Sequence, residues 1–118
     1  MRISNRIFNN PDIGSYYHRA AVRYLDEIST TLPSSPLMAD GEALDTDDRV
    51  LFTTLSNPAQ NNRIYKVEKN SGIISLTLAR DGQNPNGDTL DGDTVAVKSG
   101  SHGGELWTFD GAVWTELD

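Results

Sequence analysis

The part of the chain after residue 40 alternates short apolar runs with turn residues. Val, Ile, Thr, Tyr, Phe and Trp are concentrated in the runs, and Gly, Asn, Asp and Ser separate them, which is the pattern of an antiparallel β protein. Strands are predicted at residues 49–55, 63–69, 73–79, 94–98, 105–109 and 112–117. We therefore expect a mainly β fold with a small antiparallel β-barrel or sandwich.

The same pattern predicts the register of one strand and the position of two turns. In the second run, Ile64 is expected on one face of the sheet, and Tyr65 and Val67 on the other. Residues 70–72, Asn-Ser-Gly, are expected to form a turn between two strands. Asp110-Gly111 lies between two aromatic runs and predicts a hairpin with a primed turn, because that turn requires positive φ.

A helical period occurs only before this region. Ser15 can cap a helix over residues 15–29, whose apolar side chains would share one face. Arg23 and Glu27 are spaced for an ion pair on that helix. Residues 1–14 have no regular period and are expected to form an extended arm. Pro33 and Pro36 then favour an extended linker.

Two segments are therefore expected. Residues 1–36 would form an N-terminal attachment arm, helix and linker, and residues 37–118 an antiparallel β domain. The arm and helix are too apolar for a purely solvated tail, so they are expected to pack either on the chain's own core or on a partner. The candidate partner-binding residues are Arg2, Ile3, Arg6, Ile7, Phe8, Tyr17, Tyr24 and Ile28.

Composition narrows the classes of function. The chain has 118 residues, 10 Lys and Arg against 17 Asp and Glu, and a formal net charge of -7, which argues against nucleic-acid and anionic-membrane partners. Neither a signal peptide nor a membrane-spanning run is recognised. Without cysteine, disulfides and thiolate metal sites are excluded. A core this small is expected to gain stability from neighbouring subunits.

Candidate catalytic and metal-binding groups are few. His102 lies in a glycine-rich stretch without the nucleophile spacing of a catalytic triad, so no catalytic residue is expected. Residues 81–93 are rich in Asp and Asn and offer oxygen ligands for calcium, but the EF-hand register fails, and turn formation is the favoured interpretation. We expect neither a metal site nor a cofactor.

Aromatic residues offer one alternative site. Trp107 and Trp114, with Tyr65 and Phe109, could form a platform for sugar rings. In a small β domain such residues more often form the core, because each buries a large apolar area. Core packing is therefore favoured, and Trp107 and Trp114 stay possible glycan contacts.

A series of motifs carries a family resemblance. In chain order the motifs are Asp40-Gly41, Asp47-Asp-Arg-Val-Leu51, Asn57-Pro-Ala-Gln-Asn-Asn-Arg-Ile-Tyr-Lys-Val67, Leu76-Thr-Leu-Ala-Arg-Asp81, Gly92-Asp-Thr-Val-Ala-Val97 and Glu105-Leu-Trp-Thr-Phe109. Through them, residues 40–117 resemble a β module of bacteriophage tail-fibre and related virion proteins. Asn62-Arg63 stands where the module usually has Asn-Gly, and residues 74–78 lack its usual tryptophan.

The resemblance implies a non-enzymatic structural protein on the surface of a phage particle, with no catalytic residues to carry over. Fibre proteins usually carry this module within a much longer chain, so the length favours a capsid decoration (cement) protein over a tail-fibre, fibre-adaptor or collar component. The implied partners are major capsid or tail proteins and further copies of the chain, as a homo-oligomer with a trimer favoured. A host-glycan-binding module is the alternative from a different class.

Overall fold

The computed structural model describes residues 19–79 and 92–117. These residues are mainly β, as expected, and the only helix among them is a short 3-10 helix, η2 (Gly100–His102). The strands are β1 (Tyr24–Asp26), β2 (Met38–Ala39), β3 (Glu42–Ala43), β4 (Arg49–Phe52), β5 (Arg63–Asn70), β6 (Ile73–Leu78), β7 (Thr94–Ala96), β8 (Leu106–Phe109) and β9 (Trp114–Glu116). The predicted strands correspond to β4–β9, whereas β1, β2 and β3 were not predicted.

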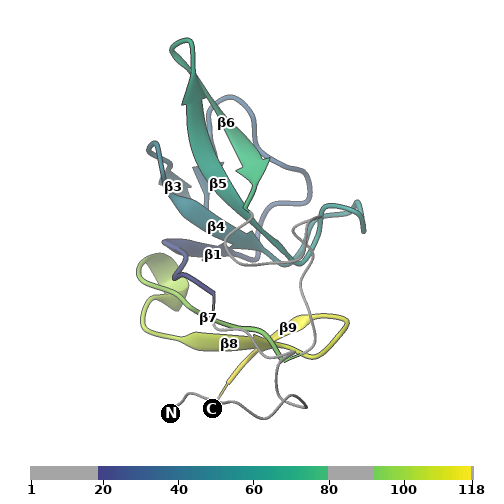
Figure 1. The fold of residues 1–118 in the computed structure, drawn as a ribbon. Helices are drawn as coiled ribbons and strands as arrows, with labels where there is room; N and C mark the ends of the chain where they lie inside the picture. Colours follow the sequence, from purple (N-terminus) through teal and green to yellow (C-terminus); the bar gives the residue numbers. More distant parts are fainter. Residues whose placement is uncertain (1–18, 80–91, 118) are drawn as a thin grey trace, which may run out of the picture.

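The strands form two main sheets and a small hairpin (Figure 1). One sheet has four strands in the order β1-β4-β5-β6, the other has three in the order β7-β8-β9, and β2 pairs only with β3. Within the described ranges both main sheets are open, so of the two expected architectures, barrel or sandwich, a closed barrel is not formed. β1 lies between the rest of the four-stranded sheet and the three-stranded sheet.

The predicted helix over residues 15–29 is wrong where the structure describes it. Residues 24–26 form β1, which pairs with β4 in parallel, so the sheet is not purely antiparallel as expected. The helical stripe was misleading because adjacent Tyr24 and Leu25 are both buried, on opposite faces of a sheet that is covered on both sides. Residues 15–18 lie outside the described part of the chain.

Residues 19–26 pass from one sheet to the other. Val22 donates its N–H to the Ala96 carbonyl and accepts the Lys98 N–H, at 3.0 and 2.9 Å, beside β7. One residue later, the Arg23 N–H bonds to the Arg49 carbonyl of β4 at 2.8 Å, and β1 follows. A strand that switches sheets forms a corner between them. The described part of the expected attachment segment is thus built into the β body.

The four-stranded sheet is covered on both faces. Between the two main sheets lies a first apolar cluster: Val22, Leu25, Leu51, Ile64, Ala79, Val95, Val97, Trp107, Phe109 and Trp114. On the opposite face lies a second cluster: Tyr24, Leu37, Ala39, Leu44, Val50, Phe52, Leu55, Tyr65 and Val67. The predicted alternation in β5 is confirmed, because Ile64 belongs to the first cluster and Tyr65 and Val67 to the second.

Two predicted turns have different outcomes. The turn expected at residues 70–72 forms one residue shorter: Asn70 still pairs with Ile73, and Ser71 and Gly72, with φ of 54° and 83°, join β5 to β6. The β8–β9 hairpin also forms, and Gly111 has the expected positive φ, of 96°, but the last paired residues are Phe109 and Trp114, so the loop has four residues. Within that loop the Asp110 carboxylate accepts the backbone N–H of Ala112 and of Val113, both at 2.9 Å, which stabilises the wider connection.

Candidate functional site

Polar and charged side chains collect where residues 19–29 pass between the sheets. We call this region the seam, and it comprises residues 19–29 with the segments that they contact at residues 40, 45–49 and 93–105. Most seam contacts join residues far apart in the sequence. The seam is where the described chain brings its charged groups together.

A buried ion pair closes one end of the seam. The Arg19 guanidinium donates from both Nε, at 3.0 Å, and Nη2 to Oδ2 of Asp93. The two side chains are 1% and 0% exposed. Arg19 also donates its backbone N–H to the Thr94 carbonyl at 2.8 Å. Removal of either charge would leave the other buried, which is far more costly than the loss of a surface pair.

Asp26, at the end of β1, organises the neighbouring turns. Its carboxylate accepts the N–H groups of Ile28, Ser29 and Asp40 at 2.7 to 2.8 Å. The Ser29 hydroxyl donates a further hydrogen bond at 3.0 Å. Burial alone would raise the pKa of the Asp26 carboxyl, but these hydrogen bonds outweigh burial and hold that pKa below its ordinary value.

His102 of η2 lies between two carboxylates. Its Nε2 is 2.8 Å from Glu27 Oε1, and its Nδ1 is 2.9 Å from Glu105 Oε1. The Trp107 indole N–H donates to the same Glu105 oxygen at 2.8 Å. Burial alone would lower the pKa of His102, but Glu105 and Glu27 raise it by hydrogen bonding and charge. Because both ring nitrogens face carboxylates, the protonated ring is the form that satisfies this site.

The turn before His102 is tied to the β2–β3 hairpin. The Asp40 carboxylate accepts the Ser101 backbone N–H at 2.8 Å and the Ser101 hydroxyl at 2.7 Å. Gly100 has φ of +80°, and a Cβ there would overlap Asp40 Oδ2 and lie 2.8 Å from the Tyr24 ring. Glycine is therefore required by both backbone conformation and space.

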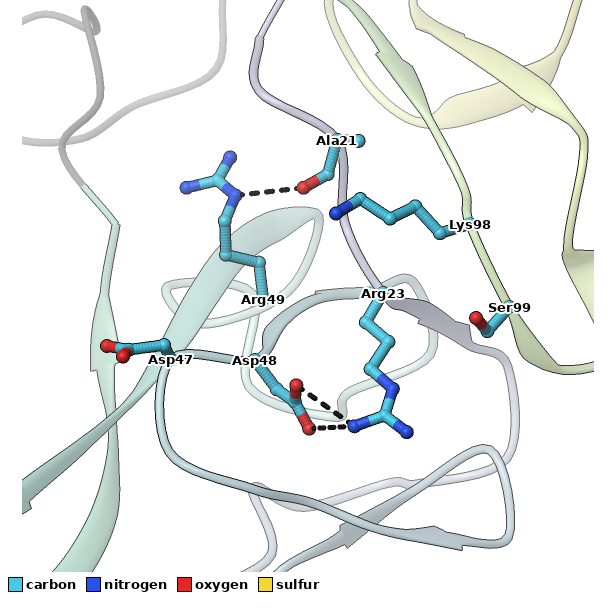
Figure 2. Close-up of a pocket in the computed structure, with 7 residues that line it drawn as sticks. All are labelled: Ala21, Arg23, Asp47, Asp48, Arg49, Lys98 and Ser99. Carbon is cyan, nitrogen blue, oxygen red and sulfur yellow. Dashed lines mark hydrogen bonds and ion pairs between the residues drawn. The ribbon is translucent and has the colours of Figure 1, made fainter.

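A small open pocket lies on the outside of the seam (Figure 2). Its volume is about 260 Å³, and it is lined by Ala21, Arg23, Asp47, Asp48, Arg49, Lys98 and Ser99. Asp48 points toward Arg23 and bonds to its Nη1 at 2.9 and 3.1 Å. Arg49 donates to the carbonyls of Ala21 and Ala20 at 3.2 and 2.9 Å.

Hydrogen bonding at the seam does not assemble a nucleophile with a base. The nearby Ser101 hydroxyl donates to Asp40, while both nitrogens of His102 face carboxylates. In the described ranges, no group of three or more His, Cys, Asp or Glu side chains is arranged to hold a metal ion. Asp93, a candidate calcium ligand, is instead the partner of Arg19. The chemistry that this arrangement offers is ionic cross-linking of the two sheets.

The residues predicted to bind a partner divide between several environments. Tyr24 is 4% exposed and packs in the second cluster, so it is a core residue and presents no partner surface here. Ile28, within the seam, is 67% exposed and stays a candidate contact. Arg2, Ile3, Arg6, Ile7, Phe8 and Tyr17 lie outside the described residues.

The possible glycan contacts are core residues. Trp107 and Trp114 are 7% and 4% exposed and belong to the first cluster. Their indole N–H groups bond to Glu105 and to the Asn62 carbonyl, respectively. The rings are therefore not available to stack on a sugar, in agreement with the favoured interpretation of both residues as core.

Sequence reasoning missed most residues of the seam. Arg23 and Glu27 do not form the expected helical pair, because Arg23 bonds to Asp48 and Glu27 to His102. One local signal was present in the sequence: Asp26 follows two apolar residues and precedes Ser29 by three positions. An Asp at the start of a turn commonly accepts the backbone N–H groups of the next residues. Partners 25 to 75 residues away have no local signature.

No match is found for this chain among known protein families, curated proteins or solved structures. Across the described ranges, no helix is long and apolar enough to cross a bilayer.

Proposed function

We propose that this chain is a non-enzymatic structural protein of a bacteriophage particle, a capsid decoration protein held to the shell by its N-terminal segment. The resemblance motifs support the proposal because they coincide with units of the fold. Asp40-Gly41 forms the β2–β3 turn, residues 47–51 lead into β4, and residues 57–67 lead into β5. Residues 92–97 and 105–109 contain β7 and β8.

The observation that carries a structural role is the use of charged groups at the seam. The Arg19–Asp93 and His102–Glu27 pairs each connect residues beside β1 with the β7–β8 region. A catalytic site needs a group left available for substrate, whereas these groups bond to one another. Such cross-links keep two open sheets in one arrangement, which suits a part that is repeated on a particle.

Attachment is proposed to use the apolar residues of the N-terminal segment. Ile28 is the one candidate partner-binding residue that the structure describes as exposed. It belongs to the seam, next to the turn that Asp26 organises, so a partner that covers it would also contact the region where both sheets meet. Burial of this side chain on a shell protein would contribute about 1.5–3 kcal/mol to attachment.

The copy number per particle tests the proposed location. Particles of the phage that encodes the chain would be purified, and the chain quantified against the major capsid protein by mass spectrometry. A decoration protein is expected in hundreds of copies, in a fixed ratio to the shell symmetry. Tens of copies or fewer would favour a tail-fibre, adaptor or collar component, and absence from the particle would refute a virion role.

A matched pair of variants tests the attachment surface. Ile28→Asp and Ile73→Asp make the same change at residues that are 67% and 71% exposed, one in the seam and one at the β5–β6 turn. Ile28→Asp is expected to reduce binding to particles stripped of the chain, whereas Ile73→Asp is expected to bind as the wild type does. Urea unfolding of both variants checks that the fold is retained. Equal binding of the two variants would contradict the proposed surface.

A further inference from the structure

Three cations from distant parts of the chain meet at the pocket on the outside of the seam. Arg23 precedes β1, Arg49 begins β4 and Lys98 follows β7. The chain as a whole has 17 acidic and 10 basic residues, so a pocket with three cations and two carboxylates runs against the overall balance. The fold concentrates positive charge here by bringing both sheets together.

Two of these cations keep hydrogen-bond donors for a ligand. Arg23 uses only Nη1 to hold Asp48 and Asp45, so its Nη2 and Nε are not engaged by those carboxylates. Lys98 is exposed and forms no ion pair with the residues that the structure describes. Its side chain extends across the pocket toward Ala21 in Figure 2. The Ser99 hydroxyl lies at the same edge.

The acidic residues of the lining do not fill the pocket. Asp47 points away from the other labelled side chains in Figure 2, and its carboxylate is 3.7 Å from Lys66 Nζ. Asp48 is held against Arg23 and also accepts the Asp45 backbone N–H at 2.7 Å. Asp48 is therefore held at the border of the pocket, Asp47 points away from it, and the space beside Lys98 stays open.

The size of the pocket limits its ligand. A volume of about 260 Å³ is below the roughly 300–1,000 Å³ of pockets that enclose whole small molecules. It suits one acidic group at the end of a longer segment. Arg23 already donates hydrogen bonds to carboxylates of this chain on one side, and a guanidinium beside an ammonium is a favourable setting for a further carboxylate.

We propose that this pocket binds a carboxylate side chain of an acidic peptide segment, held by Lys98, Arg23 and the Ser99 hydroxyl. This binding site is independent of the proposed virion role. The net charge of -7 repels an acidic partner at long range, but at physiological salt that repulsion is screened beyond about 8 Å. Contact at the pocket then decides binding.

The test is a titration of the full-length, ¹⁵N-labelled chain with an acetylated, amidated triglutamate peptide at physiological salt, followed by NMR. The amide signals of Lys98, Ser99 and Arg49 are expected to shift in a saturable manner. Lys98→Gln is expected to weaken binding about tenfold, the loss of one charge-assisted hydrogen bond. Lys98→Arg retains binding because the cation is kept.

The matched control is Lys69→Gln, which makes the same charge change at an exposed lysine of β5. This variant should bind triglutamate as the wild type does, within about twofold, and triglutamine should produce no saturable shift. Equal weakening of binding by Lys98→Gln and Lys69→Gln would overturn the proposal, because the effect would then come from the change in net charge and not from the pocket. Saturable binding of inorganic phosphate without binding of triglutamate would overturn the assignment to a carboxylate.

Discussion

The seam and the outer end of the β5–β6 hairpin are stabilised in opposite ways. At the hairpin end, residues 68–73 are all exposed, and the conformation depends on strand pairing and on the positive φ of Ser71 and Gly72. At the seam, Arg19 and Asp93 are buried, and their contact spans 74 residues of sequence. The hairpin end is thus specified locally, and the seam by contacts that exist only in the complete fold.

This difference predicts where substitutions matter. Residues of the hairpin end lose few contacts when they are changed, because water already surrounds their side chains. The buried residues of the seam are held by groups from another sheet or turn, so their removal leaves buried partners without compensation. Paired changes of similar chemistry in the two regions should therefore have very different effects on the free energy of unfolding.

The largest effect is expected for the buried ion pair. Asp93→Asn keeps the size of the side chain but leaves the Arg19 charge buried without its carboxylate. The free energy of unfolding is expected to fall by about 3–5 kcal/mol, measured by urea denaturation at neutral pH. Glu68→Gln, at an exposed side chain of the hairpin end, is the matched control and should change stability by less than about 0.5 kcal/mol.

A double variant sharpens this test. Arg19→Met combined with Asp93→Leu removes both charges and replaces them with apolar side chains, so most of the lost stability should return. If Asp93→Asn alone lowers the free energy of unfolding by less than about 1 kcal/mol, the ion pair does not contribute substantially to holding the two sheets together.

A second, somewhat smaller effect is expected from two glycines with almost the same backbone conformation. Gly100 at the seam has φ of +80°, and Gly72 at the hairpin end has φ of +83°. Alanine at either position is strained by about 1–2 kcal/mol. At Gly100 the added methyl group would also meet Asp40 and the buried ring of Tyr24, whereas nothing lies within 4 Å of a Cβ at Gly72.

Gly100→Ala is therefore expected to destabilise the protein by about 1–2 kcal/mol more than Gly72→Ala does. Thermal unfolding of the two variants under identical conditions measures the difference. Equal losses would mean that the added methyl group destabilises the seam no more than it destabilises the hairpin end, contrary to the comparison of the two regions.

The same contrast explains what the sequence predicted. Strands β4–β9 and the Ser71-Gly72 turn were predicted because alternation and turn residues act over a few positions. β1 was mistaken for a helix because a short strand buried on both faces has adjacent apolar residues, Tyr24 and Leu25, that also fit a helical stripe. Its parallel pairing with β4 has no local signal.

The candidate site was largely beyond prediction for the same reason. The aromatic core was the favoured interpretation, and burial of Trp107 and Trp114 agrees with it. The pairs Arg19–Asp93 and Glu27–His102 join residues that sequence spacing gives no reason to associate. The net charge gave no indication of the pocket, because an acidic chain still places three cations there.

A smaller effect of up to about 1 kcal/mol is expected from pH at His102. Glu105 and Glu27 raise its pKa in the folded state above the ordinary value of 6.5. The protonated ring therefore stabilises the fold fully below about pH 6.5, and this contribution is lost as pH rises through the raised pKa. Urea unfolding at a series of pH values from 6 to 9, all at the same ionic strength so that screening does not change, measures this loss.

His102→Gln is the control for this pH dependence. The variant removes the titrating ring, so the decrease in stability above pH 6.5 should disappear. Asp26 does not interfere, because its lowered pKa places its own effect at acidic pH, where stability is lost as pH falls. An unchanged pH profile in His102→Gln would assign the effect to other groups.

The smallest effect is expected at the hairpin end, for Ile73→Thr. Ile73 is 71% exposed, and threonine keeps the β-branched shape that suits a strand, so the free energy of unfolding should change by less than about 0.5 kcal/mol. Urea unfolding is measured at two protein concentrations a hundredfold apart. A loss above 1 kcal/mol that grows with protein concentration would mean that Ile73 is buried against a second copy of the chain, since only an associated state depends on concentration. The hairpin end would then be an interface between copies, stabilised like the seam by partners distant in sequence.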